Sequence, residues 1–160
     1  LQIMGSVEGM VAKAEQWCEG NGHSPVELLG ARLIDDMLPF AYQVKSCWVH
    51  SAQAVEGVRL GAFQPHMEPP PDSFAGLSEK LGEARAKLEA VDLTELDTIA
   101  DNDMVFSIGD KLRMDFTVRD FLLGFSVPNF HFHATTAYGI LRMKGVAVGK
   151  RDYLGRLPLK

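Results

Sequence analysis

Apolar residues recur at steps of three and four along most of the chain, which is the spacing of amphipathic helices. The first such stripe comprises Ile3, Val7, Met10, Val11, Ala14, Trp17 and Cys18. The run Gly20-Asn21-Gly22 predicts the end of that helix. Ser24-Pro25-Val26-Glu27 predicts a short second helix, because serine is a good N-cap and proline fits the first helical position.

A longer helix is predicted from about residue 36 to residue 58, with Asp35 or Asp36 as its N-cap and Pro39 inside its first turn. Its apolar stripe comprises Met37, Phe40, Ala41, Val44, Trp48, Ser51 and Val55. Residues 61–72 contain Pro65 and Pro69-Pro70-Pro71, and this composition predicts a polyproline-like crossover. Ser73 then predicts the cap of another helix, over about 74–91.

Two alternating runs, 104–108 and 112–116, flank Gly109-Asp110 and predict a β-hairpin. Thr117, with Asp120 three residues later, predicts the start of a last long helix that ends near residue 144 and is bent at Pro128. The tail, 146–160, is expected to be irregular and basic. These elements predict an all-α fold in a single domain over 1–160. The expected architecture is a four-helix bundle with a long Pro-rich crossover and a short β-hairpin before the last helix.

Charge and composition narrow the classes of partner. The 160 residues carry 16 Lys and Arg against 21 Asp and Glu, so the net charge of −5 argues against a nucleic-acid partner. The most apolar stretch, 121–132, is too short for a membrane span, which needs about 20 residues. Cys18 and Cys47 are too few for a disulfide scaffold and indicate free thiols in a cytoplasmic protein.

The histidines are the candidates for chemistry. His23 and His66 fall in predicted loops and are expected to be solvated. His131 and His133 point about 200° apart on a helix, so His131 is expected at the surface and His133 inside. His50 lies at the margin of the apolar stripe of its own helix. In a bundle His50 and His133 can meet across the core, which is a recurrent layout of metal sites.

A catalytic zinc ion has three protein ligands as a rule, and only two histidines are available here. Asn129, one turn before His133, is a candidate third donor, and Cys47 is another. The alternative is that His50 and His133 are hydrogen-bonded core residues. Cys47 and His50 are also spaced for a thiolate–imidazole pair, although a structural thiol is the more common outcome.

Other catalytic templates are missing from the sequence. It contains no Gly-x-Ser-x-Gly elbow and no phosphate-binding glycine loop. Asp101-Asn102-Asp103 begins like a calcium loop, but Val105 follows and the closing spacing is absent, so we interpret it as a polar turn.

Two stretches of the chain carry a family resemblance. The first is Met37-Leu38-Pro39-Phe40 with Gln43; the second is Pro128-Asn129-Phe130-His131-Phe132-His133, Thr136-Ala137-Tyr138, Ile140-Leu141-Arg142, Gly145-Val146 and Gly149-Lys150. Together they resemble a bacterial family of unknown function in the DinB/YfiT-like superfamily of proposed metalloenzymes. The resemblance extends from the second long helix to Gly155 and implies a four-helix bundle with a long crossover.

Members of that superfamily often bind a divalent metal through one histidine on the second helix and a His-x-x-x-His pair on the fourth. His50 matches the first position and His133 matches one member of the pair. Asn129 and Ala137 stand where the other member of the pair would be, so the full triad is absent.

The positions of the histidines and the family resemblance together lead to one functional expectation and one alternative. We expect a small-molecule pocket near His50 and His133, lined by Gln43, Cys47, Thr136 and Tyr138. The resemblance implies a divalent metal, zinc or nickel, held by His50, His133 and Asn129, in a thiol transferase or hydrolase. The alternative expectation is a metal-free homodimeric binding or structural module without catalytic activity.

Overall fold

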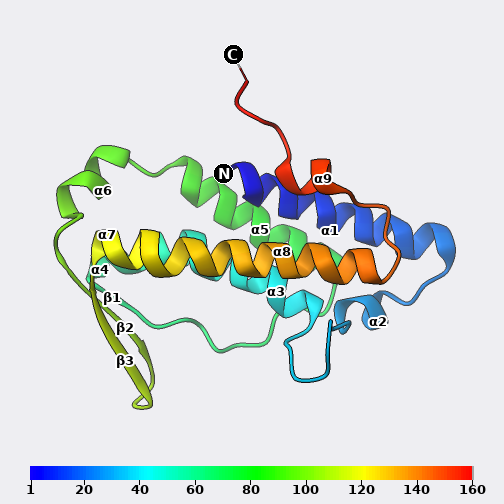
Figure 1. Cartoon of the computed structure of the whole chain (residues 1–160), viewed down its shortest axis with the longest axis horizontal. Helices are drawn as coiled ribbons and strands as arrows, with labels where there is room; N and C mark the ends of the chain where they lie inside the picture. The colour runs from blue at the N-terminus through cyan, green and yellow to red at the C-terminus, as the bar shows by residue number, and fades with distance from the viewer. Residues whose placement is uncertain (160) are drawn as a thin grey trace.

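The computed structural model describes residues 1–159 as a mostly helical fold with a small three-stranded sheet (Figure 1). The long helices α1 (Gln2–Asn21), α3 (Phe40–Trp48), α5 (Phe74–Glu89) and α8 (Val127–Met143) pack against one another. Their apolar stripes are buried in the one hydrophobic core that the 3.6-residue periodicity predicts.

The local signals for helix ends are confirmed. Gly22 ends α1 in the left-handed conformation, with φ 66°. The Ser24 side chain accepts a hydrogen bond from the Glu27 amide at the start of α2 (Pro25–Leu29), and the Ser73 side chain caps α5 in the same way. Serine provides these caps because its hydroxyl satisfies an amide that has no partner within the helix.

The second long helix begins later than predicted. α3 starts at Phe40 after Pro39, whose backbone is extended, and neither Asp35 nor Asp36 caps it. The reason is that a proline disfavours helical backbone at the residue before it, so the helix cannot run through Leu38.

This helix is also interrupted, which the sequence analysis missed. A π-helical turn, η1 (Val49–Gln53), separates α3 from α4 (Ala54–Leu60), and His50 within it has φ −86° and ψ 18°. A π-helical turn holds one more residue than an α-helical turn, so it changes the direction of every side chain that follows.

The predicted hairpin is confirmed and gains a third strand. β2 (Asp103–Ile108) and β3 (Leu112–Thr117) pair antiparallel, with Ile108 opposite Leu112. The Pro-rich crossover contains the missed strand, β1 (Ala62–Phe63), which pairs parallel with β2. The two residues of β1 carry no periodicity of their own, because their pairing is made with residues about 40 positions away in the chain.

The last long helix has a complex start. Thr117 caps α7 (Val118–Asp120), a second π-helical stretch η2 (Phe121–Ser126) follows, and α8 continues from it. Pro128 lies in the first turn of α8 and cannot donate a backbone hydrogen bond. The bend at Pro128 stays a prediction, and the irregularity found here is the wide turn η2 immediately before α8.

Five phenylalanines fix η2 against the sheet, with ring centres 4.8–6.3 Å apart. They are Phe63, Phe106, Phe116, Phe121 and Phe125. Aromatic pairs in this distance range add favourable edge and face contacts to the burial of their area. The cluster thereby holds the start of α8 in place beside η1.

Two short helices were missed as well. α6 (Leu93–Ile99) is capped by the Asp92 side chain, and α9 (Lys150–Leu154) lies in the tail that was expected to be irregular. α9 packs on α1, where Lys13 and Asp152 form an ion pair of 2.6 Å. Helices this short gain their stability from such contacts rather than from their own periodicity.

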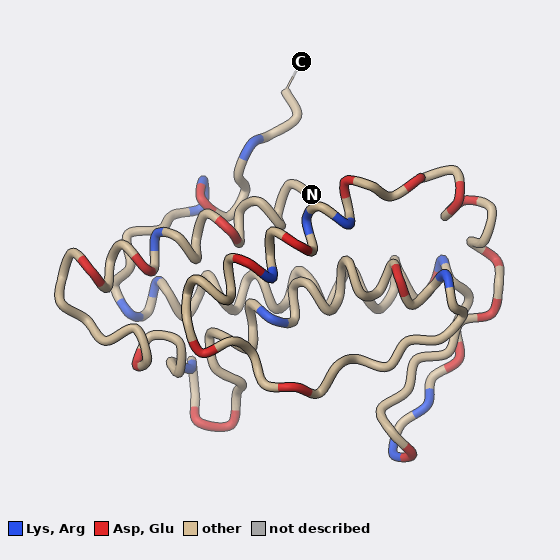
Figure 2. The backbone as a smooth tube through the Cα atoms, turned by 180° about the vertical axis from the view of Figure 1, so that it is seen from behind, with Lys and Arg blue, Asp and Glu red and all other residues tan. Residues whose placement is uncertain are grey.

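Charged residues of both signs are interspersed over the helices and loops (Figure 2). Within residues 1–159, no helix has the length and apolarity needed to cross a membrane.

Candidate functional site

The two π-helical turns meet in the core and are joined there. The Ser126 hydroxyl, at the end of η2, donates a hydrogen bond of 3.1 Å to the His50 carbonyl in η1. A π-helical turn breaks the regular hydrogen-bond pattern of a helix, and this carbonyl finds its partner on another element. Such turns are frequent at functional sites in proteins.

His50 and His133 lie together at this junction, as the packing of their helices predicts. Their ring centres are 5.7 Å apart and their planes differ by 11°. The edge of Phe125 contacts His50, with ring centres 5.9 Å apart. Both histidine side chains are half-buried.

A hydrogen bond with Gln43 orients the His133 ring. His133 Nδ1 lies 2.7 Å from the Gln43 side-chain oxygen, and the Gln43 amide nitrogen donates to the Leu38 carbonyl at 2.8 Å. The bond to Leu38 leaves the Gln43 oxygen facing the histidine, so His133 Nδ1 is the donor. The other ring nitrogen of His133, Nε2, therefore carries a free lone pair.

His50 has no comparable orienting bond. Its Nδ1 is buried and finds no hydrogen-bond partner among residues 1–159. Burial, with a smaller contribution from the neighbouring His133, lowers the pKa of His50 to about 4. Burial also lowers the pKa of His133 to about 4. Both rings are neutral at pH 7, which is the state in which imidazole binds metal ions.

The other predicted site residues mostly form hydrogen bonds to backbone carbonyls of their own helices. The Asn129 amide nitrogen donates to the Phe125 carbonyl at 2.7 Å, which leaves the Asn129 side-chain oxygen as a free acceptor. The Cys47 thiol donates to the Gln43 carbonyl at 3.4 Å, and burial raises the pKa of Cys47 far above its ordinary value. This thiol is therefore not a nucleophile at neutral pH.

Thr136 and Tyr138 take structural positions. The Thr136 hydroxyl donates to the Phe132 carbonyl at 2.8 Å. The Tyr138 ring packs edge-on against Tyr153 of α9, with ring centres 6.0 Å apart. Neither side chain is in the cavity described next.

A cavity of about 260 Å³ opens on His50 between α1, η1, α5 and the start of α8. Its polar lining consists of His50, Ser51, Ser126 and His131. Its apolar lining consists of Leu1, Met4, Val55, Leu88, Leu122, Val127 and Phe130. Gln43, Cys47, Thr136 and Tyr138 do not line it, and His133 lies behind His50 rather than in the wall.

Sequence reasoning missed Ser51, Ser126 and His131 as lining residues of this cavity. His131 is exposed as predicted, with its Nδ1 3.4 Å from the Tyr153 hydroxyl. Ser126 shares the predicted helical face of His133, which was a usable signal. The two remaining histidines are exposed, and the ring of His23 stacks on Trp17 at 3.9 Å.

The donors present can be compared with those that a divalent ion needs. Within residues 1–159, no group of three His, Cys, Asp or Glu side chains could hold a metal ion. Two imidazoles that share an ion at about 2.1 Å place their ring centres roughly 5 to 6.5 Å apart, and the observed 5.7 Å falls in that range. The spacing of the two rings is therefore compatible with an ion shared between them, and within residues 1–159 no third His, Cys, Asp or Glu ligand stands beside them.

The packing of the helices, the crossover and the small sheet is that of a DinB-like domain. A crystal structure of a DinB family member protein from Shewanella denitrificans matches with a TM-score of 0.83 and 26% sequence identity, over 99% of this chain and 88% of that chain. The chain belongs to the family described as "Domain of unknown function (DUF1993)", which matches residues 1–154. The family expectation is confirmed. No curated protein matches the sequence.

Proposed function

We propose that this DinB-like four-helix-bundle protein binds a small molecule in the His50 cavity, beside a divalent ion, zinc or nickel, held by His50 and His133. The observation that carries the proposal is the state of the two rings. His133 has a free lone pair on Nε2, and its ring stacks at 5.7 Å on the ring of His50, whose buried Nδ1 has no partner in residues 1–159. A buried polar atom without a partner in the protein is rare in folded proteins, and a water molecule, a ligand or an ion satisfies it.

The residues around His50 and His133 hold the two histidines in position or offer a further ligand. Gln43 holds the tautomer of His133, as carbonyl oxygens do for most metal-binding histidines. Ser126 and Phe125 hold the backbone and the ring of His50. The free oxygen of Asn129 is a further ligand or orients the bound molecule.

A divalent ion at this position would lower the pKa of a water or thiol bound to it, which is the chemistry of a hydrolase or a thiol transferase. The apolar walls of the cavity favour a small substrate with little charge near His50. We place this activity in the cytoplasm, where the two free thiols stay reduced.

The second candidate is a metal-free binding module. The hydrogen bond between His133 and Gln43 favours it, since this bond satisfies His133 without an ion. In that case the protein is a homodimer, and exposed apolar side chains before α3 provide its surface: Leu33, Ile34 and Leu38. The cavity then holds a ligand and no reaction follows.

Elemental mass spectrometry of tag-free protein tests the choice. The protein is incubated with zinc or nickel, desalted, and compared with His133→Ala and with His23→Ala as the control for an exposed histidine. The proposal expects one ion per chain in the native and His23→Ala proteins and a loss of the ion in His133→Ala. Metal-free native protein after both incubations would reject the ion and favour the metal-free module.

A further inference from the structure

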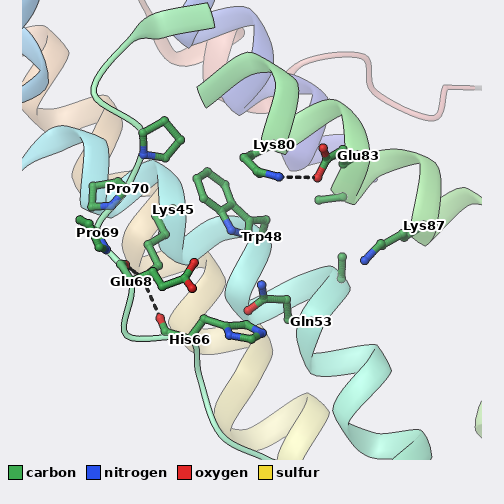
Figure 3. Close-up of a pocket in the computed structure, with 13 residues that line it drawn as sticks. Lys45, Trp48, Gln53, His66, Glu68, Pro69, Pro70, Lys80, Glu83 and Lys87 are labelled. Atoms are coloured by element: carbon green, nitrogen blue, oxygen red, sulfur yellow. Dashed lines mark hydrogen bonds and ion pairs between the residues drawn. The ribbon is translucent and has the colours of Figure 1, made fainter. Parts of the chain in front are cut away.

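A second, larger cavity lies on the other side of η1. It measures about 480 Å³ and is enclosed by α3 and η1, by the Pro-rich crossover and by α5 (Figure 3). Its volume is within the range of small-molecule sites, which is roughly 300–1,000 Å³. The two cavities share no lining residue, although residues of η1 contribute to both of them.

The crossover wall of this cavity is held in place by a buried lysine. Lys45 is 5% exposed, and its ammonium group donates to the His66 carbonyl at 2.7 Å and to the Glu68 carbonyl. Further along, Pro71 packs so closely on Gly76 that a side-chain carbon at Gly76 would lie 2.8 Å from it. These contacts fix the prolines opposite α5, so the cavity is formed before any ligand arrives.

The floor of the cavity contains an acceptor without a donor. The side-chain oxygen of Gln53 is buried and has no hydrogen-bond partner in the described part of the chain. Figure 3 shows the Gln53 amide at the end of the cavity near His66. A hydroxyl or amide N–H from a ligand would satisfy this oxygen when the Gln53 amide turns toward the cavity.

Two lysines at the rim of the cavity form exposed ion pairs in which a ligand anion can replace the glutamate. Lys80 pairs with Glu83 at 2.9 Å and Lys87 pairs with Glu56 at 2.7 Å, and all four side chains are about half exposed. Exposed pairs of this kind contribute little to stability, so a ligand anion can replace either glutamate at small cost. Three lysines and two glutamates line the cavity, and an anion that replaces Glu83 and Glu56 as the partner of Lys80 and Lys87 meets two cations there.

We propose that this cavity binds a small organic acid with an apolar body and a hydrogen-bond donor at its far end. Its carboxylate lies between Lys80 and Lys87, its apolar body lies along Trp48 and the prolines, and its hydroxyl or amide donates to Gln53. This site is independent of the histidine pair and of any ion bound there.

The fluorescence of Trp48 tests the proposal directly. The chain has two tryptophans, so a Trp17→Phe protein reports on Trp48 alone. The probe is trans-4-hydroxycyclohexanecarboxylate, which does not absorb at the excitation wavelength. Cyclohexanecarboxylate lacks the hydroxyl donor, and the methyl ester of the probe lacks the charge.

The proposal expects a saturable change in fluorescence with the probe, and at least roughly fivefold weaker binding of both matched compounds. Lys80→Met and Gln53→Leu should each weaken binding of the probe, whereas Lys80→Arg should keep it because the charge remains. His133→Ala should bind the probe as the parent protein does, which separates this site from the histidine site.

Three results would overturn the proposal. The first is the absence of any saturable change up to roughly 20 mM probe, well above the millimolar Kd of a weak site. The second is equal binding of the probe and its methyl ester. The third is binding that survives Lys80→Met and Gln53→Leu together, in a variant whose circular dichroism matches the parent protein.

Discussion

The two cavities on either side of η1 place basic side chains in different surroundings, and these surroundings affect the charge of the side chains differently. On one side His50 and His133 are half-buried, and this burial lowers the pKa of both below the physiological range. On the other side burial also lowers the pKa of Lys45, but the Glu68 carboxylate acts in the opposite direction. The Lys45 ammonium group donates hydrogen bonds to two backbone carbonyls. Burial lowers the pKa of all three groups, but an imidazole starts at about 6.5 and becomes fully neutral at pH 7, whereas an ammonium group starts at about 10.4 and is favoured in its charged form by hydrogen bonds to carbonyl oxygens.

The difference has a chemical consequence. A neutral imidazole offers a lone pair, so the His50 side is suited to an ion or an uncharged molecule. An ammonium group held by carbonyls shapes a wall and contributes positive charge, so the crossover side is suited to an anion.

The largest expected effect that tests this contrast is acid destabilisation by the histidine pair. The pKa values of His50 and His133 are lowered to about 4 in the folded chain. The stability that their neutral forms contribute is therefore fully present above pH 6.5 and is lost as the pH falls from 6.5 towards 4. Each histidine accounts for up to about 3 kcal/mol of this loss.

Urea unfolding at pH 7 and pH 4.5, in the presence of a chelator, measures this loss. His133→Leu should lose clearly less stability between the two pH values than the native protein, whereas His23→Ala should behave as the native protein does. An equal loss in His133→Leu and the native protein would show that the pair does not titrate on unfolding.

The next effect concerns the charged side of the comparison. Lys45→Met removes two hydrogen bonds from a buried ammonium group to the crossover and should lower the free energy of unfolding by about 2 kcal/mol. Amide hydrogen exchange should rise in residues 64–72 and stay unchanged in α8. Lys87→Met, which removes a lysine at the rim, is the matched control. Unchanged exchange in the crossover of Lys45→Met would contradict the role assigned to Lys45.

A smaller effect is expected where the two π-helical turns join. Ser126→Ala removes the buried hydroxyl that donates to the His50 carbonyl and should cost about 1 kcal/mol in urea unfolding. Because this bond positions His50, the variant should also bind zinc more weakly in calorimetric titration. A Ser46→Ala variant, whose buried hydroxyl bonds to the Tyr42 carbonyl within its own helix and lies outside the cavity, is the control. If Ser126→Ala binds zinc as tightly as the native protein does, the hydrogen bond between Ser126 and His50 does not position His50 for the ion.

The smallest effect is expected at the rim of the crossover cavity. Lys80→Met breaks an exposed ion pair with Glu83 and should leave the midpoint of urea unfolding unchanged. A clear shift in that midpoint would show that the pair is part of the stable structure rather than free to exchange partners.

The features predicted correctly from the sequence, such as helix caps and the inward or outward direction of a side chain, depend on residues close by in the chain. Ser24, Ser73 and Thr117 cap helices as expected, since a cap is made with amides two or three residues away. His133 faces inward and His131 outward because the stretch between Ser126 and His133 keeps ordinary helical phase.

Features that depend on distant partners were missed. The turn at His50 is joined to Ser126, 76 residues away, and β1 is defined by its pairing with β2. Gln43 was recognised as a neighbour of the site, but its bond to His133 spans 90 residues and could not be deduced from spacing. The cavity was expected around Gln43 and Cys47, whereas the wide turn η1 opens it on the other side of His50.

Nitrogen-15 NMR of the imidazole rings at pH 7 tests the central claim most directly, because it reports charge and tautomer at each ring nitrogen. The account predicts that His50 and His133 are neutral and that His133 carries its proton on Nδ1. It also predicts that addition of zinc shifts the Nε2 resonance of His133 and leaves those of His23 unchanged. A charged His133, or one protonated on Nε2, would contradict the claim that Gln43 prepares this ring to bind an ion.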